Sequence, residues 1–462
     1  MTRFEAARTL GNGALAGFLR SCDPAVAIRA ALAIGRSKNP YGVPLLLPRV
    51  HDRNLALRAM SVYGLGLIGT GSAAPAVLSA LLHDNAGPVQ VAALDAIDRL
   101  ETARTLSTGQ EQRAVRRIRE LLGTADVIVR GRAATTLEAF HLSPLAPQIV
   151  SSLDRAFRSE PDSYVRWHIM WTLFRAYAKV ASVETLQRGL QDSSELVRIA
   201  AVRAFGRRGD KTAVAYLQPL TGDPSWRVQE QTLESIKVLQ GGALTDHLKA
   251  IPHGVRTPAP VADPWASLPV LPRTPSAKLA QKPSAARIDS RLTLNPTTIK
   301  LFTGPAKGPH PRVRLVTTQG NIYLELFPEW APLTTENYLN LVNSGYYDNN
   351  VWFRIVPDFV VQTGDPTNTG NGDAGYMIPA EENPIEQAGY VLSMGMNYTN
   401  PPNAHAIRDS AGTQFYITLS PQLHLDRDFT VFGRVIAGAD VLGRLIESDK
   451  IIRAERIADI NE

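Results

Sequence analysis

The sequence predicts a multi-domain α plus β protein: an N-terminal α-solenoid of helix pairs followed by a C-terminal all-β domain. One apolar pattern recurs seven times before residue 240, and from Val313 onward short β-branched and aromatic runs are broken by Gly, Pro and Asn. A chain of 462 residues is long enough for several cores. We therefore predict a solenoid of about seven repeats over 1–250, a Pro-rich basic linker over 251–310 and a second folded domain over 311–462.

The recurring pattern has a period near 32 residues. Each copy starts at an apolar anchor, and the anchors are Val26, Leu57, Val89, Val129, Val165, Val197 and Val228. Apolar residues follow five and eight positions after each anchor, which traces one face of a helix. An Asp three or five residues before each anchor suits a helix N-cap. Each interval has room for a second apolar helix, so the units can bury their apolar faces only by stacking.

These units, with Val197-Arg198 and Ala204-Phe205-Gly206 in place, resemble HEAT repeats over about 1–245. The resemblance implies a scaffold that binds other macromolecules. Four aromatic residues at helical spacing, Trp167, Trp171, Phe174 and Tyr177, fit either the core of this scaffold or a peptide-binding stripe, and the spacing favours the core.

Charge is divided unevenly along the chain. Residues 311–462 hold 10 Lys and Arg against 19 Asp and Glu, whereas residues 1–310 hold 39 against 24. A basic N-terminal part can attract anionic partners, but no nucleic-acid motif accompanies the charge, so we expect solvated helix faces rather than nucleic-acid binding. The linker, with eleven prolines and eight basic against two acidic residues, is expected to be an extended connector.

Several classes of protein are disfavoured by simple counts. No apolar run reaches the roughly 18 to 20 residues of a membrane span, and the N-terminus has no signal pattern. The chain as written is expected to be soluble and cytoplasmic, or periplasmic or in the cell envelope if a leader was removed. Cys22 is the single cysteine. His405, His424 and Asp426 match no standard ligand spacing, so we expect neither a metal nor another cofactor.

Several long motifs occur in order within the C-terminal domain. The first contains Phe353-Arg354, then Phe359, Gln362 and Gly364-Asp365. It is followed by Gly375-Tyr376, Ser393-Met394-Gly395, Gly412-Thr413-Gln414-Phe415-Tyr416-Ile417 and Phe429-Thr430-Val431-Phe432-Gly433. This order resembles the cyclophilin-type peptidyl-prolyl cis/trans isomerases over about 311–462. The resemblance implies a closed eight-stranded antiparallel β-barrel capped by two helices. Within it, Thr334 or Thr335 is expected to cap the first helix.

The resemblance also implies a non-covalent mechanism. Rotation about an X–Pro bond faces a barrier of roughly 18–20 kcal/mol from amide resonance. Arg354 would donate to the prolyl nitrogen, which gains a lone pair only in the twisted state. Phe359 would form the floor of the proline pocket with Tyr416 and Leu425, and Gln362 would orient Arg354 and hold the substrate backbone.

Arg354, Phe359 and Gln362 are therefore the expected catalytic residues. The expected substrate-binding residues are Val360, Gly395, Met396, Gln414, Tyr416, His424, Leu425 and Phe429. Three of them depart from the family pattern: His424 stands where many members have a Trp that supports cyclosporin binding, Phe429 replaces a frequent His, and Tyr416 replaces a Phe. The segment from Met396 to Ala411 also departs from the usual connection.

The sequence thus predicts a peptidyl-prolyl cis/trans isomerase that assists protein folding or assembly. Its substrates would be proline-containing polypeptides, and its solenoid would recruit client or partner proteins. The alternative is a scaffold or assembly factor whose C-terminal domain binds proline-containing segments with little turnover. Intact Arg354, Phe359 and Gln362 favour the enzyme, because a pure binding module has no need for Arg354.

Overall fold

The computed structural model describes residues 1–241, 270, 310–398, 406–426 and 428–458. The chain divides into two compact units, one of Ala7–Pro252 and one of Met1–Ala6 with His253–Glu462. Most of the predicted linker lies outside the described residues. Among the helices that the structure describes, none combines the length and apolar character needed to cross a membrane.

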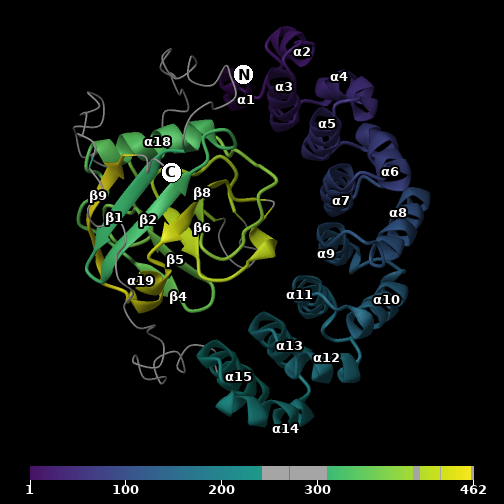
Figure 1. Cartoon of the computed structure of the whole chain (residues 1–462), viewed down its shortest axis with the longest axis vertical. Coiled ribbons are helices and arrows are strands. Elements are labelled where there is room, and N and C mark those ends of the chain that lie inside the picture. The colour runs from purple at the N-terminus through teal and green to yellow at the C-terminus, as the bar shows by residue number, and fades with distance from the viewer. Residues whose placement is uncertain (242–269, 271–309, 399–405, 427, 459–462) are drawn as a thin grey trace. The chain divides into compact units, whose positions relative to one another are not determined.

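The Ala7–Pro252 unit is a stack of helix pairs in two rows (Figure 1). After α2 (Ala14–Leu19), the row that carries the seven anchors consists of α3 (Pro24–Arg36), α5 (Leu55–Ile68), α7 (Gly87–Thr102), α9 (Val127–Thr136), α11 (Ser163–Thr172), α13 (Glu195–Arg208) and α15 (Trp226–Leu239). The second row consists of α4 (Val43–Leu46), α6 (Ala74–His83), α8 (Thr108–Leu121), α10 (Ala146–Ser159), α12 (Val183–Leu190) and α14 (Val214–Leu217). The N-terminal α1 (Thr2–Ala6) belongs to the other unit.

The apolar face predicted from the repeat is the buried face of the stack. Six anchors are buried, and Val26 of the first repeat is half-buried, as is Leu233 of the last. The two ends of a stack have only one neighbour each, which explains this pattern. Trp167, Trp171 and Tyr177 are buried and only Phe174 is half-buried, so these aromatic residues are mainly core.

Charged hydrogen bonds join successive repeats. An arginine directly after the anchor donates its Nε to a carboxylate of the next repeat: Arg58 to Asp84 at 2.7 Å, Arg130 to Glu160 at 2.8 Å, Arg166 to Asp192 at 2.6 Å and Arg198 to Asp223 at 2.8 Å. The Nη1 of Arg198 also donates to the carbonyl oxygen of Asp192 at 2.8 Å. Each such arginine therefore fixes its own loop and the following one.

The expectation that the aspartates are N-caps is correct for three of them. Asp23, Asp126 and Asp162 cap α3, α9 and α11 through backbone N–H groups. Asp52, Asp84, Asp192 and Asp223 instead lie two residues before the N-cap and accept the N–H of the capping residue at 2.8 to 2.9 Å. Three of these four carboxylates are also the ones that bind the arginine of the preceding repeat.

The C-terminal unit is a curled antiparallel sheet of nine described strands. They are β1 (Arg312–Thr317), β2 (Gly320–Leu326), β3 (Asn350–Val351), β4 (Arg354–Val356), β5 (Val360–Thr363), β6 (Val391–Met394), β7 (Phe415–Thr418), β8 (Val431–Ala437) and β9 (Lys450–Ile457). Their hydrogen-bonded order is β3-β9-β1-β2-β8-β6-β7-β5-β4. The helices α18 (Pro332–Asn343) and α19 (Ala439–Arg444) pack on this sheet, and Val270 bridges Ile457 of β9.

The predicted closed eight-stranded barrel is wrong in two respects, because the sheet has nine strands and its ladder is open. Its edge strands β3 and β4 are nevertheless linked by Trp352 and Phe353, a connection that spans at most about 11 Å. The sheet must therefore curl until its edges approach. Across that gap Thr363 donates its hydroxyl to the carbonyl oxygen of Val351 at 2.9 Å, while the Trp352 side chain is buried. The result is a half-barrel.

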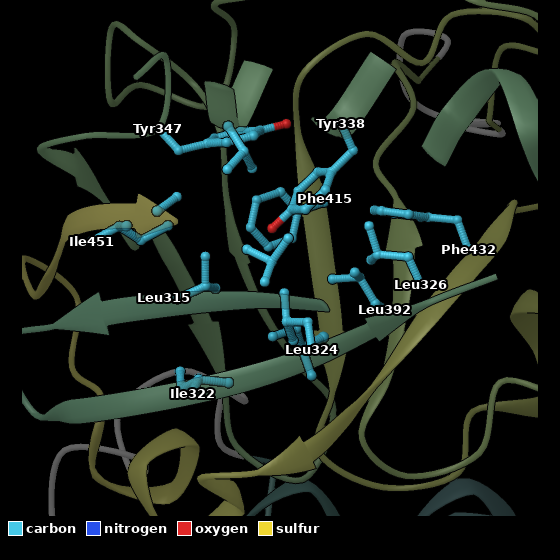
Figure 2. Packing of buried hydrophobic residues seen from close by; sticks show 14 of the residues in the cluster. Leu315, Ile322, Leu324, Leu326, Tyr338, Tyr347, Leu392, Phe415, Phe432 and Ile451 are labelled. Atoms are coloured by element: carbon cyan, nitrogen blue, oxygen red, sulfur yellow. The ribbon is translucent and has the colours of Figure 1, made fainter. Parts of the chain in front are cut away.

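Aliphatic and aromatic side chains together fill the inside of the curled sheet (Figure 2). The Tyr338 ring of α18 lies 5.3 Å from Phe415 and 5.2 Å from Phe432, and Tyr347 lies 5.3 Å from Phe415. The Tyr347 hydroxyl donates to the carbonyl oxygen of Thr413 at 3.0 Å. The core thus fixes the start of β7. It also fixes the backbone of Gln414, which lies between Thr413 and Phe415 and belongs to the candidate active site.

The expected cap of α18 is also wrong. The N-cap position is Ala331, and the buried Glu381 accepts the N–H groups of Leu333 at 3.1 Å and Thr334 at 2.8 Å. A carboxylate 47 residues further along the chain thus takes the place of a local hydroxyl. Its negative charge suits the positive end of the helix dipole.

The arginine–carboxylate pairs yield a prediction for stability. Arg198→Ala leaves the Asp223 side chain, only 7% exposed, without its main partner, so we expect unfolding free energy to fall by about 2 kcal/mol. The control is Arg188→Ala, whose side chain is 55% exposed and pairs with an exposed Glu184; its loss should cost at most about 0.5 kcal/mol. Denaturant unfolding measures both, and equal effects would contradict the role given to the pairs.

The same pairs give the stability a pH dependence. Burial opposes ionisation of Asp223, but Arg198 and the Ser225 N–H outweigh it and lower the pKa of this carboxyl in the folded protein. The stability contributed by this lowered pKa is fully present above the pKa of an Asp in the unfolded chain, about 3.9. It is lost as the pH falls through the pKa of Asp223 in the folded protein. The gap in melting temperature between wild type and Arg198→Ala should therefore narrow below about pH 4.

Candidate active site

Three neighbouring strands bring the predicted residues together. Arg354 of β4 lies opposite Gln362 of β5, and Gln362 lies opposite Tyr416 of β7. Phe359 ends the tight turn between β4 and β5, in which its N–H donates to the carbonyl oxygen of Val356 at 3.0 Å. Asp358 in this turn has a φ of 55°, a conformation that Asp tolerates better than most residues.

The orientation of Arg354 is set by a chain of side-chain hydrogen bonds. Its Nη1 donates to Oε1 of Gln362 at 3.1 Å, and Nε2 of Gln362 donates to Oε1 of Gln414 at 3.0 Å. Nε2 of Gln414 then donates to the carbonyl oxygens of Gly370 and Gly372, both at 3.0 Å. Two carbonyl acceptors leave Gln414 one possible amide orientation, and that orientation is passed on to Gln362.

The two carbonyl groups are held by a buried carboxylate that the sequence analysis gave no role. Asp365 accepts the N–H groups of Thr367 at 2.7 Å, Thr369 at 2.8 Å and Gly370 at 2.5 Å. Burial opposes ionisation, but the hydrogen bonds from Thr367, Gly372 and Thr369 lower the pKa of Asp365 overall. A Cβ at Gly372 would lie 2.0 Å from Oδ1 of Asp365, so any other residue there would displace this carboxylate. Asp365 therefore fixes the loop on which Gln414 depends.

An apolar cluster adjoins the hydrogen-bonded side chains. Its buried members are Val360, Tyr416, Leu425 and Phe429, and Phe359, Met396 and Ala406 pack against them. The Tyr416 and Phe429 rings meet edge to face at 5.7 Å. A compact apolar group of this kind, with a cation at its edge, offers a surface for a small apolar ring.

The guanidinium and the cluster meet at Phe359. The Cζ atom of Arg354 lies 5.4 Å from the centre of the Phe359 ring, and His424 stacks on the same ring at 5.7 Å with planes 16° apart. Arg354 itself is exposed, and in the part of the chain that the structure describes no carboxylate pairs with it. Its positive charge is thus held in place without being neutralised.

Gly395 completes the group of predicted residues. Its N–H donates to the carbonyl oxygen of Gln414 at 2.8 Å, and a Cβ there would lie 3.3 Å from Nε2 of Gln362. All eleven predicted site residues therefore belong to one contiguous group, while their roles stay predictions. Sequence reasoning missed the function of Asp365, although the signature includes it, and the contribution of Ala406.

The described residues contain no group of three His, Cys, Asp or Glu side chains arranged to hold a metal ion. His405, one of the three residues considered for such a group, lies outside the described residues.

Comparisons with known proteins identify two families in this chain. The family model for cyclophilin type peptidyl-prolyl cis-trans isomerases matches residues 312–460, and that for HEAT repeats matches 11–98 and 151–237. Peptidyl-prolyl cis-trans isomerase-like 1 of Gibberella zeae is 35% identical over 31% of this chain and 94% of its own length. Isomerase CYP18-2 of Arabidopsis thaliana is 41% identical over 30% of this chain and 82% of its own.

A crystal structure of a cyclophilin type isomerase from Cryptosporidium parvum is 28% identical, covers 33% of this chain and 99% of that one, and has a TM-score of 0.30. The matched relatives are thus little more than the C-terminal domain alone. The chain belongs to the cyclophilin-type peptidyl-prolyl cis-trans isomerase family, and it carries this enzyme behind N-terminal HEAT repeats.

Proposed function

We propose that this isomerase acts by the non-covalent mechanism in which Arg354 stabilises the twisted prolyl amide. The observation that carries the proposal is the Arg354 guanidinium, fixed by Gln362 and Phe359, without a carboxylate partner in the described chain, at the edge of an apolar cluster. The prolyl ring would rest on Phe359, Tyr416 and Leu425. Its nitrogen would then face a donor that is already oriented.

The energetic logic favours a fixed donor. In the planar amide the prolyl nitrogen shares its lone pair with the carbonyl group and accepts hydrogen bonds poorly. As the bond twists the lone pair localises, so a hydrogen bond from Arg354 strengthens only in the transition state. Because the Gln362–Gln414 chain holds the guanidinium beforehand, no reorganisation is needed during the reaction.

The remaining predicted residues would hold the substrate. Gly395 and Met396 would pair with an extended backbone, and Gln362 would share that task. Val360, His424 and Phe429 would form the wall around the prolyl ring. The chain would need no cofactor, because rotation about a bond requires neither electron nor group transfer.

We also propose that the HEAT repeats recruit client or partner proteins, since such stacks offer extended binding surfaces. A connector of about 60 residues would keep the isomerase at roughly millimolar effective concentration near anything the repeats bind. Substrate turnover on recruited clients would rise without a change in the active site.

Arg354→Ala tests the mechanism. We expect the rate of cis-to-trans conversion of a short X–Pro peptide to fall about 10²- to 10³-fold, as for loss of one transition-state donor. The uncatalysed step takes tens of seconds, so protease-coupled or NMR exchange assays resolve it. The matched control is Arg434→Ala, an exposed arginine of β8 that should keep normal turnover. Near-normal turnover in Arg354→Ala would instead favour a binding module or a different electrophile.

Position 424 gives a second test. The stacked imidazole of His424 offers less flat surface and a different donor than an indole would. We therefore expect cyclosporin A to bind distinctly more weakly than to a relative with Trp, and His424→Trp to recover part of the affinity. Calorimetric titration measures both, and unchanged affinity after the substitution would contradict this assignment.

Recruitment is tested by comparing the full chain with residues 311–462. Both should isomerise short peptides equally, within about twofold. The full chain should accelerate a prolyl-limited refolding reaction of a bound client at least about 10-fold more than the domain alone. The full chain with Arg354→Ala controls for binding without catalysis. Equal refolding rates for the full chain and the domain would show that the repeats do not recruit.

A further inference from the structure

The connection between β6 and β7 contributes Gly395, Met396 and Gln414 to the proposed mechanism, which gives no role to its residues 397–410. Its described ends are Met396–Tyr398 and Ala406–Ser410, and they pair with each other through an antiparallel bridge between Tyr398 and Ala406. The N–H of Ile407 donates to the carbonyl oxygen of Asn397 at 2.7 Å, and the N–H of Asn397 donates to the Ser410 hydroxyl at 2.9 Å. The backbone at Tyr398 is therefore anchored.

This pairing places an aromatic side chain at the rim of the apolar cluster. The Tyr398 ring lies 6.4 Å from the Phe429 ring, and Phe429 in turn lies 5.7 Å from the buried Tyr416. The three rings form a series that runs from the buried floor to the surface. Ala406, the bridge partner of Tyr398, also packs against the cluster.

Tyr398 lies within the electrostatic range of Arg354. Partial burial raises the pKa of the Tyr398 hydroxyl, and the positive charge of Arg354 acts in the opposite direction. The net shift is upward, so the ring is neutral at neutral pH and presents an apolar face with a hydroxyl at its edge.

The exposure of this ring is unusual for a structural residue. Tyr398 is 53% exposed although it forms a β-bridge with Ala406 and the preceding Asn397 is hydrogen-bonded through both its N–H and its carbonyl group. A fixed, half-open aromatic ring is well suited to bind another apolar group, because little conformational freedom is lost on contact.

We propose that Tyr398 is a specificity-determining residue that contacts the side chain of X in the X–Pro substrate and favours aromatic or large apolar X. The proposal rests on the proposed function, because Arg354 marks where the X–Pro amide would lie. A ring that lies next to Phe429 and within the electrostatic range of Arg354 would then flank the residue before proline, while the prolyl ring occupies the cluster. Tyr398 is a substrate-contacting residue in this proposal and takes no part in weakening the amide.

The test is a peptide series that differs only at X, assayed with the full chain. With X as Ala, Leu, Phe or Glu, wild type should prefer Phe over Ala in kcat/KM by about 2- to 10-fold, the range expected for one aromatic contact. Tyr398→Ala should reduce that ratio to near one while turnover of Ala–Pro stays within about twofold. Tyr398→Phe should keep the preference, since the ring remains.

A variant that adds a positive charge at position 398 tests the contact without shortening the side chain to Ala. Tyr398→Lys should raise the ratio of Glu–Pro to Phe–Pro turnover, which a purely structural role would not produce. The matched control is Ile407→Ala, a 43% exposed residue of the same segment, which should leave the profile over X unchanged. If Ile407→Ala abolishes the preference, the fold of the segment rather than Tyr398 is responsible, and the proposal is wrong.

Failure of this proposal is distinguishable from failure of the mechanism. A wild type without preference at X, or a Tyr398→Ala variant that slows all peptides equally, overturns the specificity role whatever Arg354 does. Peptide affinities measured by titration in the Arg354→Ala background report the preference without catalysis. If that background keeps full turnover, the mechanism fails, and the affinities still decide the role of Tyr398.

Discussion

The side-chain amide of Gln414 links the packed core of the half-barrel to the exposed Arg354. On one side, Gln414 lies between Thr413, which Tyr347 holds, and the buried Phe415. On the other side, its oxygen accepts from Gln362, which in turn accepts from Arg354. A surface guanidinium on a long flexible side chain would otherwise sample many rotamers, at a cost of roughly 2 kcal/mol when one is selected. The chain of amides provides that selection from inside the domain.

The same principle, a cation fixed by a partner that is itself fixed, recurs in the repeats with a different outcome. Arg166 and Arg198 meet carboxylates that backbone N–H groups already orient, so both charges are satisfied and the repeats are joined. Gln90 occupies the corresponding position of the third repeat and donates to its own loop, at the carbonyl oxygen of Asp84. Neutral amides orient Arg354 without neutralising its charge. The carboxylates that bind Arg166 and Arg198 neutralise those charges and stabilise the contact between repeats.

Sequence periodicity predicted the features of the fold that depend on residues close together in the chain. The seven anchors and the helices that carry them follow from this local pattern. The open nine-stranded ladder and the cap on α18 from Glu381 depend on residues distant in sequence, which no local pattern encodes. Asp365 stood in the recognised signature, yet its role became visible only with the loop from Thr367 to Gly370 around it. Asp365 acts on Gln414 through backbone carbonyl groups, and an interaction with the backbone leaves no pattern of residue types in the sequence.

The site divides its tasks between two kinds of structure. The register of the strands fixes the spacing of Arg354, Gln362 and Tyr416. Such fixed spacing is needed to place donors around a single X–Pro bond. Tyr398 sits on the connection between β6 and β7, where a change of residue disturbs no ladder. Under the proposed function, rotation of the amide would then be the constant property of the sheet, and the choice of X would belong to the connection. Selectivity could change through residues 397–410 alone, because the hydrogen-bond chain behind Arg354 reaches Asp365 through Gln414 and Gly370, which lie outside those residues.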